Sequence, residues 1–436
     1  MNHTDTIAAT ATAMGSAGIG IIRISGPEAF AVLEKVFRPK NEKKVMSEQP
    51  GYTVHYGMAV DGDQVLDEVL VMLMRGPHSY TAEDTAEIDC HGGRLVMQKI
   101  LEAVLKHGVR AAEPGEFTKR AFLNGRMDLS QAEAVMDLIQ SKNEMALKSS
   151  LAQLKGTVRQ EIEKLRAQIL YEMAFVEAAL DDPEHISLDG YSDELLTKVR
   201  KIAAEVEKLL KSSESGRMLK EGIKTVILGK PNAGKSSLLN VLLGEERAIV
   251  TEIAGTTRDV LEEQLQLGEV SLQLLDTAGI RFTEDVVEQI GVERARKQAE
   301  DADLILYVAD SSRALDESDR EILKLLEDKK ALVLLNKSDL EPVITPETMR
   351  EKTGHPVLVI SAKEGEGIQE LEEKIRSLFF QGEVDFNDEV LITNLRQKQA
   401  LADAANSLEM VIESIENGMP EDFFTIDLKD AYTSLG

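Results

Sequence analysis

Three short motifs, each behind an apolar run, constrain the fold of this chain more than any other feature. They read Gly-Lys-Pro-Asn-Ala-Gly-Lys-Ser at 229–236, Asp-Thr-Ala-Gly at 276–279 and Asn-Lys-Ser-Asp at 336–339. Each follows an apolar run of the kind that forms a buried strand, at 225–228, 270–275 and 331–335. The order of these runs and motifs predicts a Ras-like P-loop domain with a doubly wound α/β sheet.

The first motif contains the residue types that a phosphate-binding loop requires. Gly229 and Gly234 allow backbone N–H groups to turn toward phosphate oxygens. Lys235 reaches the β- and γ-phosphates, and the Ser236 hydroxyl is suited to ligate magnesium. Residues 237–242 have helical apolar spacing, so the loop is expected to lead directly into a helix.

The later motifs predict specificity for guanine. Asp276 is placed to hold the water shell of the metal, and the Gly279 N–H is placed to meet the γ-phosphate. A carboxylate at Asp339 accepts the paired N–H donors of guanine, whereas adenine leaves that acceptor unpaired. Asn336 and the Ser-Ala-Lys run at 361–363 complete the expected base pocket. Each element taken singly is compatible with an ordinary turn, but four in order behind strands argue strongly against that interpretation.

The usual water-orienting group is missing from this sequence. Ras-like enzymes place a Gln directly after the Asp-x-x-Gly motif, and here that position holds Ile280. A hydrophobic side chain cannot polarise water, so hydrolysis must use another group. The nearest candidate carboxylates are Glu284, Asp285 and Glu288. Arg258 and Arg281 are also near, although the sequence identifies neither as an arginine finger.

Asn232, within the phosphate-binding loop, has two interpretations. Its side-chain oxygen is suited to ligate a monovalent cation at the place where an arginine charge would otherwise lie. Alternatively, it serves turn formation after Pro231.

The composition is that of a folded protein of about two to four domains. No apolar run approaches the roughly 20 residues of a membrane span, and the N-terminus lacks a signal-peptide pattern. We therefore expect a soluble, cytoplasmic protein. The net charge of -27 argues against a protein that coats nucleic acid, so RNA contact requires a local basic patch or a partner. The single cysteine, Cys90, is expected to be a small buried side chain.

The remaining sequence predicts further domains around the nucleotide-binding one. Residues 1–118 contain short β-type runs with Gly-rich turns and helical stretches, which indicates an α+β domain. We expect a helical domain over 119–220 and 381–436, interrupted by the nucleotide-binding domain at 221–380. Its apolar stripes are Ile162, Leu165, Ile169, Met173, Val176 and Leu180, then Leu195, Val199, Ile202, Val206 and Leu209, then Leu391, Leu395, Leu401, Leu408 and Ile412.

The whole chain resembles the MnmE (TrmE) family of tRNA-modification GTPases. The resemblance rests on Asp-Thr-Ile-Ala-Ala-Thr-Ala-Thr at 5–12, Arg-Gly-Pro-His-Ser-Tyr-Thr at 75–81 and His-Gly-Gly at 91–93. It also rests on Pro-Gly-Glu-Phe-Thr-Lys-Arg-Ala-Phe-Leu-Asn-Gly at 114–125 and Ala-Gly-Thr-Thr-Arg-Asp at 254–259 within the inserted domain.

The resemblance implies a homodimer whose N-terminal domain binds a one-carbon tetrahydrofolate, in the 5-formyl or 5,10-methylene form. It also implies GTP hydrolysis with Mg²⁺ and potassium-dependent G-domain dimerisation. A FAD-containing partner of the MnmG type and tRNA complete the system, in a heterotetramer. Together they place an aminomethyl or carboxymethylaminomethyl group on C5 of the wobble uridine, and GTP turnover drives a conformational cycle.

The family motifs also imply roles for particular residues. The folate contacts are Arg23, Glu87 and Arg126, and at the last the family usually has Lys. The magnesium ligands are Ser236 and Thr257, and the potassium ligands are Asn232, Thr251, Ile253 and Thr256. Glu288 matches the carboxylate that orients the hydrolytic water, although a solvated charge is the simpler interpretation without the family match. The full set of GTP contacts is Asn232, Ala233, Gly234, Lys235, Ser236, Ser237, Thr251, Glu252, Ile253, Ala254, Gly255, Thr256, Thr257, Asp276, Thr277, Ala278, Gly279, Asn336, Lys337, Asp339, Ser361, Ala362 and Lys363.

The C-terminus of this chain departs from the family pattern. The family usually ends in Cys-x-Gly-Lys, which this chain lacks. We expect a C-terminally shortened form that retains GTP hydrolysis but is impaired in tRNA modification. The main alternative is a ribosome-assembly or RNA-checkpoint GTPase, which is disfavoured because no basic C-terminal module is evident. A folate-dependent transferase with an inactive G domain is disfavoured because the nucleotide motifs are intact.

Overall fold

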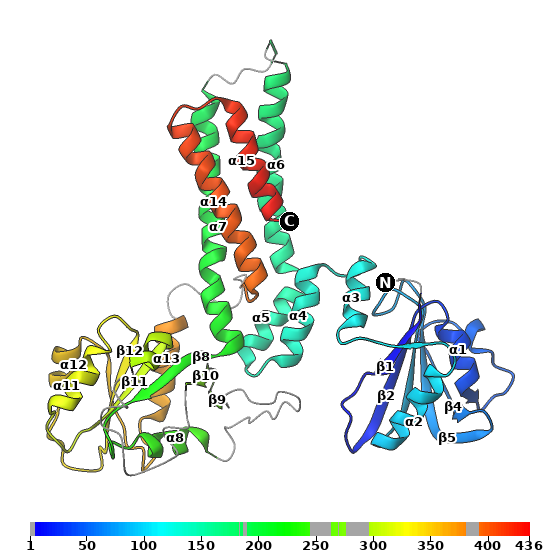
Figure 1. The fold of residues 1–436 in the computed structure, drawn as a ribbon, viewed down its shortest axis with the longest axis horizontal. Helices are drawn as coiled ribbons and strands as arrows, with labels where there is room; N and C mark the ends of the chain where they lie inside the picture. The colour runs from blue at the N-terminus through cyan, green and yellow to red at the C-terminus, as the bar shows by residue number, and fades with distance from the viewer. Residues whose placement is uncertain are drawn as a thin grey trace. The chain divides into compact units, whose positions relative to one another are not determined.

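The computed structural model describes residues 5–182, 184–185, 190–244, 263–268, 270–275, 296–380 and 392–436. The chain forms two compact units, Met1–Met136 and Asp137–Gly436. The first unit contains a mixed sheet with helices, and the second contains a helical bundle and a nucleotide-binding domain (Figure 1). The three domain boundaries expected from the sequence, after residues 118, 220 and 380, remain predictions.

The first unit is built on a sheet of order β3-β4-β5-β6-β2-β1-β7. Neighbouring strands are antiparallel, except for the parallel pair β1 and β7. Its strands are β1 (Ile7–Thr10), β2 (Ala17–Ser25), β3 (Phe37–Pro39), β4 (Thr53–Asp61), β5 (Gln64–Met74), β6 (Thr85–Gly92) and β7 (Arg110–Ala111). Its helical elements are α1 (Ala29–Val36), η1 (Met46–Glu48), α2 (Arg94–Leu105) and α3 (Glu116–Leu123).

Strand alternation determines which side chains this sheet buries. Ile22 and Ile24 of β2 are fully buried in a cluster with residues of α1 and α2, so Arg23 between them lies on the opposite face. Cys90 of β6 is 4% exposed and its thiol donates to the Gly20 carbonyl at 3.2 Å. Burial raises the pKa of Cys90 to about 11. The expectation of a small buried side chain at Cys90 is confirmed.

The helical part of the second unit is a bundle made from segments on both sides of the nucleotide-binding domain. Helix α7 packs against α14, and α6 packs against α15, through one shared apolar cluster (Figure 1). The helices of this part are α5 (Glu144–Leu154), α6 (Thr157–Asp181), α7 (Tyr191–Glu221), α14 (Leu395–Glu416) and α15 (Glu421–Ser434), and α4 (Leu129–Gln140) spans the boundary between the two units. The expected packing of the last segment against the first two is confirmed.

Two residues of the expected apolar stripes lie outside the packed core. Leu180 is 42% exposed in the last turn of α6, and Leu395 is 80% exposed as the first residue of α14. The expectation that they are buried is wrong, because both lie at helix ends, past the part of the stripe that is packed. Leu391 lies outside the described residues.

The nucleotide-binding part contains a sheet of order β13-β12-β11-β8-β10-β9, parallel except for β9. Its elements are β8 (Ile223–Leu228), α8 (Lys235–Leu243), β9 (Glu263–Leu267), β10 (Val270–Leu274), β11 (Leu304–Asp310), α11 (Glu317–Lys324), β12 (Ala331–Asn336), α12 (Pro346–Thr353), β13 (Val357–Val359) and α13 (Ile368–Phe380). Leu306 and Val308 pack with residues of α8 and α13, whereas Ile305 and Tyr307 pack on the face that includes Met349 of α12. Helices on both faces confirm the doubly wound fold. No helix in the described part of the chain is long and apolar enough to cross a membrane.

Candidate functional sites

The phosphate-binding loop connects β8 to α8 and passes close to neighbouring backbone. Gly229 has φ +151°, and a Cβ there would lie 2.3 Å from the Val308 carbonyl oxygen. Gly234 has φ +99°, and a Cβ there would lie 2.0 Å from Asn336 Nδ2. Both positions therefore require glycine, for its left-handed backbone and its lack of a side chain. This geometry gives the loop the tight turn that a phosphate cradle needs.

Lys235 lies folded against this loop. Its Nζ donates to the carbonyl oxygens of Gly229 at 2.6 Å and Lys230 at 2.7 Å. Burial lowers the pKa of Lys235 from its usual value. Ser236 and Ser237 follow in the first turn of α8, whose backbone N–H groups and dipole favour an anion. The loop, the ammonium group and the helix terminus together form a site suited to a polyphosphate.

Asn336 ties the phosphate-binding loop to the 361–363 loop. It is the last residue of β12 and is 2% exposed. Its Nδ2 donates to the Ala233 carbonyl at 2.8 Å, and its Oδ1 accepts from the Ala362 N–H at 2.9 Å. These contacts make Asn336 a brace between the two loops, and its expected contact with GTP remains a prediction.

Asp339 has an exposed side chain, and Ser361 orients its carboxylate. Ser361 is fully buried, and its hydroxyl donates to Asp339 Oδ1 at 3.1 Å. Lys337 adopts φ +66°, and its Nζ pairs with Asp310 Oδ2 at 2.5 Å. Burial alone would raise the pKa of Asp310, but the bonds from Lys337 and Ser312 lower it below its usual value. The structure thus brings Asn336, Asp339 and the 361–363 loop together beside the phosphate-binding loop, as the motifs indicated.

Sequence reasoning missed a second anchor of the phosphate-binding loop. Lys230 forms ion pairs with Asp316 and, at 3.4 Å, with Asp319. Asp319 is 6% exposed and accepts a hydrogen bond from Tyr307 at 2.8 Å. Asp316 and Asp319 form the capping box of α11, so the Asp-x-x-Asp spacing was the available signal.

Asn232 has φ +62° and an exposed side chain within the phosphate-binding loop. Asn tolerates this left-handed conformation better than most residues, which agrees with the turn-forming interpretation. Its role as a potassium ligand remains a prediction. The remaining expected residues of this site lie outside the described residues: Thr251, Glu252, Ile253, Ala254, Gly255, Thr256, Thr257, Arg258, Asp276, Thr277, Ala278, Gly279, Ile280, Arg281, Glu284, Asp285 and Glu288.

In the first unit, two of the expected folate contacts, Arg23 and Arg126, lie against the Tyr80 ring, and the third, Glu87, pairs with Arg23. Arg23 and Glu87 are directly opposite on β2 and β6, and Arg23 Nε donates to Glu87 Oε1 at 2.6 Å. The guanidinium carbons of Arg23 and Arg126 lie 5.4 Å and 5.0 Å from the centre of the Tyr80 ring. Phe117 adds a second ring 5.5 Å from Arg23. These distances are within the range of cation–π contacts.

Tyr80 and Phe117 were not among the residues expected at this site. Both lie inside the family motifs at 75–81 and 114–125, which was the only signal in the sequence. The site combines two guanidinium groups, one carboxylate and two aromatic faces. Such a set suits a flat, polar heterocycle that carries carboxylate groups, which is the chemistry of a folate.

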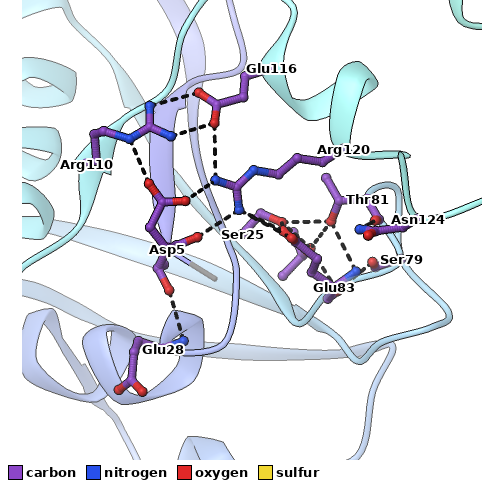
Figure 2. Close-up of polar contacts among 12 residues, drawn as sticks. Asp5, Ser25, Glu28, Ser79, Thr81, Glu83, Arg110, Glu116, Arg120 and Asn124 are labelled. Carbon is purple, nitrogen blue, oxygen red and sulfur yellow. Dashed lines mark hydrogen bonds and ion pairs between the residues drawn. The ribbon is translucent and has the colours of Figure 1, made fainter. Parts of the chain in front are cut away.

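A network of charged side chains surrounds Arg120 (Figure 2). Arg120 is 5% exposed and pairs with Asp5 at 2.7 Å, Glu116 at 3.1 Å and Glu83 at 3.3 Å. Arg110 pairs with Asp5 at 2.8 Å and with Glu116 at 2.6 Å. The hydrogen bonds from Arg110 outweigh the effect of burial and lower the pKa of Glu116 to about 2. The network joins the residues before β1, strand β7, helix α3 and the loop before β6.

Comparisons with known proteins cover the whole chain. Residues 6–126 match the family model described as the GTP-binding protein TrmE N-terminus. Residues 129–436 match the model described as the MnmE helical domain. The solved structure of the G domain of the T. maritima FeoB iron transporter is 29% identical, and the match covers 36% of this chain and 99% of the FeoB chain. The TM-score of this match is 0.26.

Curated relatives match over nearly their full length. The tRNA modification GTPase MnmE of Lachnoclostridium phytofermentans is 59% identical over 99% of this chain and 94% of its own. The protein of the same name from Clostridioides difficile is 48% identical over 99% of this chain and 94% of its own. This chain therefore belongs to the MnmE (TrmE) family of tRNA modification GTPases.

Proposed function

We propose that this chain hydrolyses GTP to drive the modification of certain tRNAs at C5 of the wobble uridine. With a FAD-containing partner, it would add an aminomethyl or carboxymethylaminomethyl group whose carbon comes from a one-carbon tetrahydrofolate. The observation that carries the proposal is the cluster of Arg23, Glu87, Arg126 and Tyr80, in a chain that also holds a guanine-type base pocket.

The folate part of the proposal rests on the chemistry of this ring cluster. The Arg23 and Arg126 guanidinium groups suit the carboxylates of a glutamyl tail. Glu87 is an acceptor for the amino-pyrimidine donors of a pterin, because a carboxylate has two oxygens and several acceptor positions. The Tyr80 ring offers a face for stacking. When bound, a one-carbon tetrahydrofolate supplies the carbon unit, and these side chains bind and orient it.

The GTPase part of the proposal assigns each group a separate task. Lys235 leaves its carbonyl partners to neutralise the β- and γ-phosphates, while the glycine loop donates N–H groups. Ser236 and Thr257 would ligate magnesium. Asn232, Thr251, Ile253 and Thr256 would ligate a potassium ion that places positive charge where an arginine finger otherwise acts. Glu288 would orient the attacking water, because Ile280 cannot.

A homodimer is supported by an apolar sheet face in the first unit. The patch lies on the neighbouring strands β4 and β5, where Val54, Tyr56, Met58 and Leu70 are 36% to 59% exposed. The paired registers put these side chains on the face opposite α1 and α2. A contiguous exposed apolar patch marks an interaction site. We propose that a second copy of this chain covers part of it.

The test is transfer of labelled carbon to tRNA. Undermodified tRNA is incubated with the chain, the FAD-containing partner, GTP, glycine or ammonium, and 5,10-methylenetetrahydrofolate that carries an isotopic label in its one-carbon unit. We expect label in the wobble nucleoside above the level of mixtures that lack the chain or GTP, but below the level reached with a relative that ends in Cys-x-Gly-Lys, as measured by mass spectrometry of nucleosides. Label that appears equally in those two mixtures, or no label at all, would contradict the proposal.

A further inference from the structure

The side chains of the proposed folate site come from separate pieces of backbone. Arg23 and Glu87 lie on the sheet, and Tyr80 lies on the loop at 75–84 that precedes β6. Phe117 lies on α3, and Arg126 lies just beyond it. A ligand that touches all of them needs the loop and α3 to be fixed against the sheet before it binds. Binding sites of this kind depend on supporting contacts that hold the ligand-contacting groups in place.

We propose that Arg120, together with Glu83, is the positioning pair of this site and holds the Tyr80 loop against α3. The proposal rests on the folate function proposed above. Arg120 lies on α3, one turn after Phe117, and its guanidinium contacts both Glu83 oxygens at 3.3 Å. Glu83 also accepts from the Ser25 hydroxyl of β2 at 2.7 Å. Loop, helix and sheet therefore meet at one carboxylate (Figure 2).

Further contacts fasten the same loop to the same helix. The Tyr80 hydroxyl and the Thr118 hydroxyl are 2.8 Å apart, and Asn124 Nδ2 donates to the Thr81 carbonyl at 2.7 Å. The Arg120 side chain is nearly fully buried, and an unpaired buried guanidinium would be strongly destabilising. Its charge therefore needs its carboxylate partners, of which Glu83 lies on the loop. Loss of Glu83 therefore weakens the attachment of the loop at 75–84 to α3.

The loop backbone itself requires external support. Ala82 has φ +61°, a conformation that disfavours residues with a Cβ. It lies between Thr81 and Glu83, which hold the bonds to Asn124 and Arg120. Strained backbone persists only where surrounding contacts determine it, and such positions cluster at ligand sites. The strain at Ala82 is what we expect of a loop held in a ligand-ready form.

Arg110 provides a matched control within the same network. It pairs with Asp5 and Glu116, as Arg120 does, and donates to the Ala111 carbonyl. These partners lie outside the loop at 75–84, so Arg110 stabilises the base of α3 without touching the loop. If the network only stabilises the fold, loss of either arginine should affect ligand binding in proportion to stability.

The experiment measures the affinity of the full chain for 5-formyltetrahydrofolate by calorimetry, with the unfolding midpoint from circular dichroism. We expect Glu83→Gln and Arg120→Gln to raise Kd about tenfold or more, because each removes a charge-assisted contact between loop and helix. Arg110→Gln should lower the unfolding midpoint and leave Kd within about twofold of the unsubstituted chain, because it does not touch the loop. Adding Ala82→Gly to Glu83→Gln should restore about fivefold of the lost affinity by relieving the left-handed strain.

Each outcome decides one of the two proposals. If the unsubstituted chain binds and Glu83→Gln binds equally well, or if Arg110→Gln loses as much affinity as Glu83→Gln, the positioning role is wrong. Failure of the unsubstituted chain to bind would instead overturn the folate function on which the role rests. Glu83→Gln preserves shape and removes only the charge, so it remains decisive even where Arg120→Gln does not fold.

Discussion

Replacing Asp339 by asparagine is expected to change the base preference of this protein from guanine to xanthine. The carboxylate accepts from two guanine N–H groups, and the amide has one acceptor and one donor. Xanthine carries a carbonyl where guanine has its amino group, so it pairs with the amide. A site built on such hydrogen bonds rejects the mismatched base strongly, and we expect the ratio of Kd for GTP to Kd for XTP to rise about a thousandfold.

Competition of GTP and XTP for the Asp339→Asn variant measures this ratio directly. Asp328→Asn is the matched control, because it makes the same change in charge at an exposed position of the same domain. That control should keep its preference for GTP. Retention of GTP preference by Asp339→Asn would show that Asp339 does not contact the base. Ser361 donates to Oδ1 of Asp339 at 3.1 Å, so Oδ2 has no part in that bond and faces no competition from it for the base. The substitution should therefore change base specificity.

Replacing Lys235 by alanine is expected to weaken nucleotide binding at least about a hundredfold. Its ammonium group lies within the phosphate-binding loop, where burial lowers its pKa and where it now bonds to two carbonyl oxygens. A bound polyphosphate would replace these neutral partners with charged ones, and two charge-assisted bonds correspond to about 3 kcal/mol or more.

Binding of a fluorescent GDP analogue tests the effect of Lys235→Ala. Lys352→Ala removes one exposed cation from α12 of the same domain and should leave Kd unchanged. Equal affinity of both variants would mean that nucleotide does not occupy the loop. The unfolding midpoint of Lys235→Ala should fall little, since its present bonds are to carbonyl groups that water can satisfy in the loop.

Local patterns predicted the fold well because they depend on neighbours in the chain. The apolar runs before each motif became β8, β10, β12 and β13, and the helical stripes became α6, α7 and α14. The prediction was wrong at Leu180 and Leu395, because periodicity does not show where a neighbouring helix ends.

The sites were less predictable because they depend on contacts between distant segments. Asn336 was recognised by its motif, but its role as a brace depends on Ala233 and Ala362, which reach it from other loops. The sequence did not identify Tyr80 and Phe117. They contact Arg23 only once the chain has folded and β2, the loop at 75–84 and α3 pack together. Arg120 likewise acquires its partners through tertiary packing.

GTP hydrolysis in matched potassium and sodium buffers is the most direct test of cation-assisted hydrolysis by this chain. The variants Asn232→Ala and Asn232→Gly accompany the unsubstituted chain. Glycine tolerates the left-handed backbone at φ +62° but lacks the side chain and its oxygen, so it separates turn formation from cation binding. We predict strong stimulation by potassium that both variants lose. Equal rates in the two salts, or stimulation that Asn232→Gly retains, would contradict cation-assisted hydrolysis and would make Arg258 and Arg281 the leading candidates for the catalytic charge.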